Sequence, residues 1–467
     1  MNRRTFLQSS FYTLLLSAVE KHHNYISPNQ LDQYGGWRGK KFKATGFFRV
    51  EKDKRWWLVS PEGHAFLSFG INHFHSGWWK QPYNKNQWME KLGVEDVNQM
   101  DTVLRNWVLE TCKTYGFNTA GVHTDLGVLN TPSSRLPYMQ TINFVDISHW
   151  KNSIEDENFV DIFSESFYQH CAQLARAVAA PLKDDPYLLG YAMADCPLFT
   201  EEDCRARPDN IYGARRGARV GWPRRLRNLG AAAAGKQAYV QLMSSLYEGN
   251  IHKFNTTYTT TFDSFEALEK VEHWRLKTDL SNANEIRDNV AFLQLCVEQY
   301  YQTTKAATQR YDPNHLFFGD KLNGNTDTVD TVLGVISKYT DVLFYQMYGK
   351  YELQQSSLDR WSNKVDMPII NGDSAYTHNK ETLPQPYGPI AESEAQNAAW
   401  TEEFFYQAFA RPEFVGWHVC GLIDTPVNLV KKESDRQHAG LFNGYGEPYT
   451  QLKATYIKCS KDLYTVP

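Results

Sequence analysis

Eight short apolar runs, alternating with helical patterns, constrain the fold of this 467-residue chain more than any other feature. The runs are rich in β-branched and aromatic residues, and most of them end in polar residues of types that enzymes use. They cover residues 66–72, 117–123, 139–145, 188–195, 315–321, 342–348, 368–373 and 414–420. Eight strands that alternate with helices predict an α/β fold, a parallel (β/α)8 barrel.

Two segments lie outside this alternation. Residues 42–60 predict two strands joined by a polar turn, so we expect an N-terminal β extension over 26–62 and a barrel over 63–467. Residues from about 200 to 277 interrupt the alternation after the fourth run and predict a long loop on the catalytic face of the barrel.

The loop after the fourth run is rich in arginine, which binds sulfate and carboxylate groups through two oxygens at once. An anionic substrate is one interpretation. The other is a solvated loop in which the arginines pair with nearby acidic residues. The arginines are Arg205, Arg207, Arg215, Arg216, Arg219, Arg224, Arg225 and Arg227, and the acidic residues are Glu201, Glu202, Asp203 and Asp209.

The first 25 residues predict an export signal. Arg3 and Arg4 precede an apolar run over residues 11–19 that is too short to span a bilayer. This pattern resembles a bacterial twin-arginine signal. We therefore expect an exported protein, periplasmic or secreted, that does not associate with membranes once the signal is removed. Seven scattered cysteines do not suggest a dense disulfide framework.

Composition narrows the class of partner. Hydrophobic residues make up 42% of the chain and aromatic residues 14%, which excludes a disordered protein. A formal net charge of -4 argues against binding to nucleic acid by bulk electrostatics. Aromatic rings stack on the flat faces of sugars, so the aromatic excess favours a carbohydrate partner. We expect no cofactor, and the oligomeric state stays open.

Polar residues gather where the predicted strands end, which is where barrel enzymes carry their active residues. Carboxylates at the ends of the fourth and seventh runs would face each other across the barrel mouth, as glycoside hydrolysis requires. The residues at the ends of the runs are Asn72, His73, His75, His123, Asp125, Asp195, Cys196, Asp320, Lys321, Tyr345, Gln346, Tyr348, Asp373, Trp417, His418 and Asp424.

Three segments resemble β-agarase-like glycoside hydrolases, family 50 and its relatives in clan A. They are residues 44–72, 159–191 and 312–321, and the resemblance spans roughly residues 40–455. It implies a barrel enzyme that cleaves a polysaccharide of the agar or carrageenan type. The fourth strand of the family ends in Asn-Glu, whereas this chain has Asp195-Cys196. Asp373 stands where the family has a nucleophilic Glu, so both standard catalytic glutamates are changed.

The strand ends and the resemblance together suggest roles for the residues of the mouth, which we give as hypotheses. Asp195 is the candidate general acid, with Glu201 or Glu202 as alternatives, and Asp373 is the candidate nucleophile or base. Tyr345 or Tyr348 would hydrogen-bond Asp373, and Trp417 would form a sugar platform. The other predicted substrate-binding residues are Asn72, His73, His123, Lys321, Gln346 and His418. Retaining and inverting mechanisms both stay open.

Two rival functions remain. A metal-dependent hydrolase of the amidohydrolase type is suggested by His73 and His75 together with Asp424, although a single His-x-His pair is a weak metal signal and we expect no metal. A carbohydrate-binding barrel without catalysis is suggested by the loss of both standard glutamates.

Overall fold

The computed structural model describes residues 26–125, 135–147, 160–199, 221–380, 388–426 and 439–466. The predicted export signal lies outside the described residues. So do Glu201, Glu202 and five of the eight arginines of the insertion. Within the described part of the chain, no helix has the length and apolar character needed to cross a membrane.

The eight predicted runs form eight parallel strands that close into a barrel, as expected. In chain order they are β5 (Ser68–Ile71), β6 (Thr119–Ala120), β7 (Tyr138–Thr141), β8 (Leu188–Asp195), β9 (Leu316–Asn323), β10 (Leu343–Gln346), β11 (Ile369–Ser374) and β14 (Phe414–Val419). Each strand pairs with its neighbours in this order, and β14 pairs in parallel with β5 to close the sheet. The carboxyl ends of all eight strands therefore lie at one mouth.

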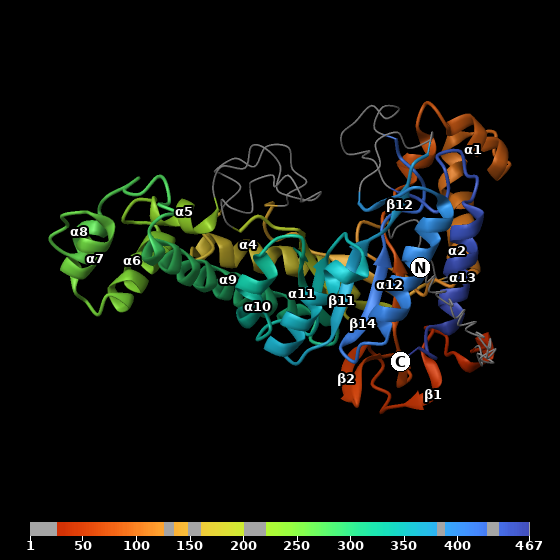
Figure 1. Ribbon diagram of the computed structural model, residues 1–467, viewed down its shortest axis with the longest axis horizontal. Coiled ribbons are helices and arrows are strands. Elements are labelled where there is room, and N and C mark those ends of the chain that lie inside the picture. Colours follow the sequence, from red (N-terminus) through yellow and green to blue (C-terminus); the bar gives the residue numbers. More distant parts are fainter. Residues whose placement is uncertain are drawn as a thin grey trace, which may run out of the picture.

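Helices surround the barrel (Figure 1). Some of them begin at polar residues that cap the first free backbone amides: the Ser164 hydroxyl accepts from Phe167 N, and the Asn282 side chain accepts from Glu285 N. Outward strand residues pack beneath them, as Phe69 does against Phe405 with ring centroids 5.3 Å apart. The helices are α1 (Lys85–Leu92), α2 (Met100–Tyr115), α4 (Glu165–Val178), α9 (Ala283–Tyr311), α10 (Thr328–Ile336), α11 (Tyr351–Lys364), α12 (Glu394–Phe409) and α13 (Thr450–Asp462).

Inside the barrel, glycines make room for large neighbours. A Cβ on Gly372 would lie 1.9 Å from Phe344 Cε2, and one on Gly121 would lie 1.9 Å from Asn72 Oδ1. Since real Cβ atoms do not approach this closely, a side chain at either glycine would force the neighbouring group to shift. The interior can therefore hold polar side chains such as Asn72 beneath the mouth.

The N-terminal extension is a four-stranded antiparallel sheet in the order β1-β4-β3-β2. Its strands are β1 (Trp37–Lys41), β2 (Arg49–Asp53), β3 (Arg55–Val59) and β4 (His64–Phe66), and β2 pairs with β3 as a hairpin. The Arg55 guanidinium donates to Phe409 O at 2.9 Å and to Phe414 O at 2.6 Å. Because Phe414 begins β14, the extension lies at the end of the barrel opposite the mouth.

The described part of the insertion is helical, not a loop. Its helices are α5 (Trp222–Arg227), α6 (Ala234–Leu246), α7 (Ile251–Tyr258) and α8 (Phe265–Glu269), which gather around the N-terminal part of α9. They stand away from the barrel at one end of the molecule (Figure 1). Apolar residues at helical spacing, such as Tyr239 and Met243, are buried there and stabilise the helices.

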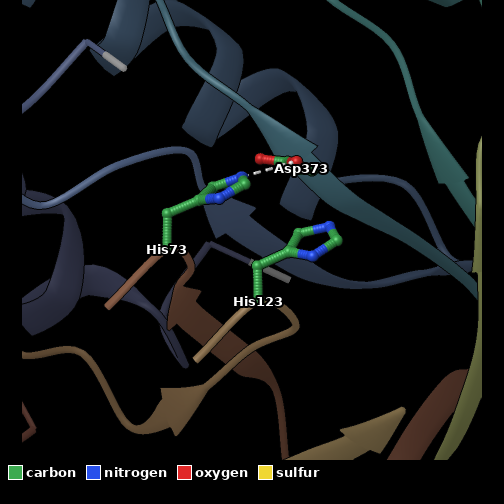
Figure 2. Close-up of side chains that lie close together, drawn as sticks. All are labelled: His73, His123 and Asp373. Atoms are coloured by element: carbon green, nitrogen blue, oxygen red, sulfur yellow. Dashed lines mark hydrogen bonds and ion pairs between the residues drawn. The ribbon is translucent and has the colours of Figure 1, made fainter. Parts of the chain in front are cut away.

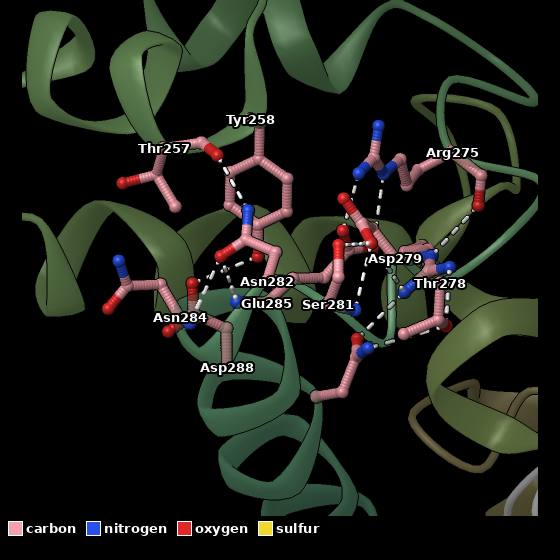
Figure 3. Close-up of polar contacts among 12 residues, drawn as sticks. Thr257, Tyr258, Arg275, Thr278, Asp279, Ser281, Asn282, Asn284, Glu285 and Asp288 are labelled. Carbon is pink, nitrogen blue, oxygen red and sulfur yellow. Dashed lines mark hydrogen bonds and ion pairs between the residues drawn. The ribbon is translucent and has the colours of Figure 1, made fainter.

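The buried charged side chains described in and beside the insertion have partners, among them the pair of Arg275 and Glu285 (Figure 3). Glu285 accepts from Arg275 Nε at 3.0 Å, and Arg227 donates to Arg275 O at 3.0 Å. Lys236 Nζ donates to Arg227 O at 2.8 Å and to Val271 O at 2.9 Å. With only 1% of its surface exposed, Arg227 belongs to this network and is not placed to bind an anionic substrate.

Candidate active site

Lys321 joins the two predicted catalytic carboxylates at the mouth of the barrel. Its Nζ lies 2.6 Å from Asp373 Oδ2 and 3.0 Å from Asp195 Oδ1. Asp195 and Lys321 are paired in register at the ends of β8 and β9, while Asp373 comes from β11. The predicted meeting of Asp195 and Asp373 therefore occurs, and one ammonium group mediates it.

The environment of Asp373 keeps it ionised. Burial acts to raise the pKa of this carboxyl, but Lys321 and His73 outweigh burial and hold the pKa well below its usual range. The Tyr348 hydroxyl donates to Asp373 Oδ1 at 3.3 Å, as expected for one of the two candidate tyrosines. Burial also acts to lower the pKa of Lys321, but Asp195 and Asp373 raise it, so this side chain stays an ammonium.

Two histidines stack beside the carboxylates (Figure 2). The rings of His73 and His123 have centroids 4.6 Å apart and planes inclined by 17°. His73 Nε2 lies 3.1 Å from Asp373 Oδ2. His123 Nε2 lies 3.1 Å from Lys321 Nζ and 3.3 Å from Asp195 Oδ2. Each histidine thus contacts one of the two carboxylates.

The backbone is left-handed at three residues of the mouth. His73 has φ 59°, His123 has φ 60° and Cys196 has φ 46°. Residues other than glycine rarely adopt this backbone conformation, and such strained residues are found most often at functional sites. At Cys196 the turn is held by a hydrogen bond from its amide to Lys321 O at 2.8 Å, which fixes Asp195 beside Lys321.

Beneath the carboxylates, three predicted site residues carry polar atoms without a partner among the residues that the structure describes. They are Asn72 Oδ1, His418 Nδ1 and both amide atoms of Gln346. Burial lowers the pKa of His418 to about 3, so this imidazole is neutral. Buried polar atoms are nearly always hydrogen-bonded, so these atoms are suited to meet a ligand or ordered water.

Two predicted site residues point away from the mouth. The Tyr345 hydroxyl donates to Gln354 Oε1 at 3.1 Å on α11 and does not reach Asp373. Trp417 donates from Nε1 to Ser374 Oγ at 2.9 Å, and its ring packs against Phe404 of α12 with centroids 4.8 Å apart, so it offers no sugar platform. Successive residues of a strand face opposite ways, and their neighbours Gln346 and His418 take the inward positions.

Asp320 also lies outside the mouth, although it precedes Lys321 directly. Gly319 has φ 70° and shifts the register between β8 and β9, so Asp320 faces α9. Its Oδ1 accepts from Ala194 N at 2.9 Å and from the Tyr300 hydroxyl at 3.3 Å. Burial raises the pKa of Asp320 to about 7. This carboxyl supports the backbone next to Asp195.

The side chains of the mouth do not fit a resident metal. His73, His123 and Asp373 offer atoms within 4.8 Å of one another. However, the Lys321 ammonium contacts both His123 and Asp373, and its charge would repel a second cation.

The metal-hydrolase rival also lacks its predicted ligands. His75 is exposed and accepts from Gly77 N at 3.3 Å, away from His73's partner Asp373. Asp424 is buried and pairs with Lys380 at 3.0 Å. The structure therefore does not bring the His-x-His pair and Asp424 together.

Sequence comparison relates the chain to β-agarases. No family model matches it. Beta-agarase B of Vibrio sp. (strain JT0107) is 22% identical over 494 residues, which covers 92% of this chain and 50% of the relative. Beta-agarase A of the same strain is 21% identical and covers 86% of this chain and 44% of the relative. The chain thus spans about half the length of the curated relatives it matches.

Solved structures share the fold. An exo-beta-agarase aligns with a TM-score of 0.75 at 18% identity, covering 94% of this chain and 68% of the other. The agarase AgWH50C aligns with a TM-score of 0.76 at 17% identity, covering 93% and 68%. These similarities agree with the resemblance to β-agarase-like enzymes and with the (β/α)8 barrel.

Proposed function

We propose that this protein is a glycoside hydrolase that cleaves an agar-like polysaccharide or its oligosaccharides. The observation that carries the proposal is the buried, ionised Asp373 beside Asp195 at the mouth of the barrel. Similarity to Beta-agarase B over 92% of the chain supports the substrate class. Ionised carboxylates at this position attack the anomeric carbon in retaining glycosidases.

Asp373 is the proposed nucleophile. The proposed proton donor is Asp195 or a residue in contact with it. A ring nitrogen of His123 lies within 4.8 Å of an Asp373 oxygen, and both carboxylates contact one nitrogen of Lys321. Retaining enzymes need about 5–5.5 Å between their two carboxyl groups, and inverting enzymes about 6.5–9.5 Å. The compact arrangement favours retention of the anomeric configuration.

The sugar is proposed to bind over the unpartnered polar atoms of Asn72, Gln346 and His418. Hydroxyl groups can both donate to and accept from these atoms, which compensates their burial. Sulfate or uronate on the substrate remains a proposal that rests on Arg224, Arg225 and the arginines outside the described residues.

The test is a screen of agarose, carrageenan and their oligosaccharides, with NMR of the first sugar released. We expect reducing ends from agar-type substrates with the anomeric configuration retained. Asp373→Asn should lose turnover and keep binding, while His170→Gln, on the exposed face of α4, should match the wild type. Turnover at the wild-type rate by Asp373→Asn would contradict the assignment.

A sugar-binding barrel without catalysis is the second candidate. The observation that favours it is Lys321, whose ammonium stands between Asp195 and Asp373 and pairs with both. In that case calorimetry would detect oligosaccharide binding, and no sugar would be released from any substrate of the panel.

We further propose that the chain is exported with a twin-arginine signal. The support is the pattern of Arg3, Arg4 and the apolar run over residues 11–19. Replacing both arginines by lysine should keep the protein in the cytoplasm of a bacterial host, as measured by cell fractionation. Unchanged export of the double variant would remove the proposal.

A further inference from the structure

We propose that His123 is the proton donor to the departing sugar and that Asp195 positions and stabilises its charged ring. This inference rests on the proposed glycoside hydrolase function and assigns the acid within the same site. It departs from the expectation that Asp195 donates the proton itself. The contacts of the groups around Lys321 carry the argument.

Asp195 is poorly placed to hold a proton. Its Oδ1 lies 3.0 Å from the Lys321 ammonium, and its Oδ2 lies 3.3 Å from His123 Nε2. Each oxygen thus faces a cation or a hydrogen-bond donor, and both contacts favour the charged carboxylate. A general acid must instead carry a proton when the substrate binds.

The other groups that face His123 cannot donate either. Burial lowers the pKa of His73, which contacts Asp373 through Nε2. The pKa of Lys321 is raised by its two carboxylates, so its proton is tightly held. Asp373 is the ionised nucleophile. The thiol of Cys196, beside Asp195, is fully buried, and burial raises its pKa.

His123 contacts Asp195 and is also more exposed than the side chains around it. About 30% of its side-chain surface is exposed, against 13% for His73, 12% for Asp195 and 2% for both Lys321 and Asp373. The substrate and solvent can therefore reach this ring more readily than the other four side chains.

Both protonation states of His123 have a partner. The charged ring donates from Nε2 to Asp195, and the neutral ring accepts at Nε2 from Lys321. Proton release and return therefore need little rearrangement of the site. Burial lowers the pKa of the stacked His73, so the charges that a protonated His123 meets are those of Lys321 and Asp195. The Lys321 ammonium at 3.1 Å opposes the proton on Nε2, and the Asp195 carboxylate at 3.3 Å favours it.

The chemistry proceeds in two balanced steps. First, an Asp373 oxygen bonds to the anomeric carbon as the bond from that carbon to the leaving oxygen breaks. The leaving oxygen keeps the electron pair and takes the proton from His123 Nε2, so the sugar departs as an alcohol. Second, neutral His123 takes a proton from water, whose oxygen bonds to the anomeric carbon and releases the Asp373 carboxylate.

The test compares two substrates that differ in their need for an acid. An agar-type oligosaccharide has a poor leaving group, whereas a dinitrophenyl glycoside of the same sugar leaves without a proton. In His123→Gln we expect kcat/KM on the oligosaccharide to fall by about 10²–10⁴-fold, and that on the dinitrophenyl glycoside by less than about tenfold. His75→Gln, the same change at an exposed histidine of the neighbouring loop, should leave both values unchanged.

Two further readouts separate a donor from a structural residue. With the dinitrophenyl glycoside, His123→Gln should accumulate the glycosyl-enzyme on Asp373, seen as a mass increase of the intact protein. The fall of kcat/KM at alkaline pH should disappear in this variant and move to lower pH in Asp195→Asn. His123→Asn should behave like His123→Gln, which guards against a folding defect of one variant.

The inference would be overturned if Asp195→Asn lost kcat/KM on the oligosaccharide but kept it on the dinitrophenyl glycoside, while the His123 variants did not show this difference. Asp195 would then be the donor. Wild-type rates in His123→Gln on the oligosaccharide would also overturn it while leaving the proposed function intact. If the wild-type protein releases no sugar from any substrate, the proposed function fails, and this inference fails with it.

Discussion

The barrel mouth and the helical insertion both bury charged side chains, but they satisfy them differently. In the insertion, Glu285 pairs with Arg275 (Figure 3), and Lys236 donates to two backbone carbonyls. At the mouth, one ammonium serves both Asp195 and Asp373. Burying a charge is tolerated where its partners are complete. The mouth therefore differs from the insertion in that two carboxylates share one cation.

The polar atoms nearby extend this contrast. Both amide atoms of Gln346 and Nδ1 of His418 have no partner in the described part of the chain, and three residues of the mouth have left-handed backbones. In the insertion, Asp288 accepts from the Tyr247 hydroxyl at 2.6 Å and the Tyr258 hydroxyl at 2.9 Å. Buried polar atoms without a partner also occur elsewhere in the described residues, as at Trp274 Nε1 in the insertion, but at the mouth three residues carry such atoms.

Removing the shared cation should have the largest effect. Lys321→Met leaves Asp195 and Asp373 without their ammonium, so the pKa of Asp373 rises and its ionised form is less populated. We expect activity to fall by about 10³-fold or more and the free energy of unfolding to fall by about 3–5 kcal/mol. Enzyme assays and urea unfolding measure the two effects. Lys338→Met, at an exposed pair, is the control, and equal losses in both variants would contradict the proposed role.

Removing a cation from the insertion should affect stability alone. Arg275→Met leaves the fully buried Glu285, among the described residues, with the more distant Arg227 at 3.9 Å as its remaining cation. We expect a loss of about 3 kcal/mol in urea unfolding and an unchanged kcat/KM at low temperature. Arg360→Met breaks an exposed pair with Asp330 and should cost less than about 1 kcal/mol. A large loss of activity in Arg275→Met would connect the insertion to catalysis.

The buried Asp320 should give the protein a pH dependence of stability. Burial raises its folded pKa from 3.8 to about 7, so the folded state holds the proton more tightly than the unfolded state. Stability is therefore highest below pH 3.8 as far as this group is concerned, and it falls as pH rises until about pH 7. The full loss is at most about 4 kcal/mol.

Asp320→Asn keeps an acceptor for Ala194 N and cannot ionise, so it should remove this fall. Melting temperatures between pH 4 and pH 8 measure the difference between the variant and the wild type. Parallel curves for the two proteins would mean that Asp320 is not protonated in the folded state near neutral pH.

Gln346 should give the smallest effect and the sharpest contrast with Arg275. Because its amide has no partner among the described residues, Gln346→Leu removes no hydrogen bond and should leave unfolding within about 1 kcal/mol of the wild type. If the amide binds a sugar hydroxyl, KM should rise by about tenfold. A loss of several kcal/mol without a change in KM would make Gln346 a structural residue.

The order of strands could be predicted from the sequence, because each buried run is bounded by helices and polar ends. All eight runs became barrel strands, and β8 has the predicted bounds of residues 188–195. Side-chain direction could not be predicted in the same way. Strands buried on both faces lack the alternation of polar and apolar residues that reports direction. The sequence therefore predicts Tyr345 and Trp417 at the mouth, although they face the helices.

The contact of Lys321 with both carboxylates could not be predicted from the sequence either. The carboxylates could be identified from strand ends, and Lys321 was predicted to bind substrate. Its contact with both carboxylates depends on the register of β8 and β9, which shifts near Gly319. A glycine within a strand signals such a bulge but does not say which neighbours it brings together.

The glycines of the barrel interior limit how this site can change. The ring of Phe344 occupies the space that a side chain at Gly372 would need, and the imidazole of His418 occupies the space beside Gly70. A library that varies one position at a time would score alanine at Gly372 as inactive for reasons of volume alone. Variants that exchange size between both members of a pair keep the total volume, so an effort to redesign this pocket has to mutate the pairs together.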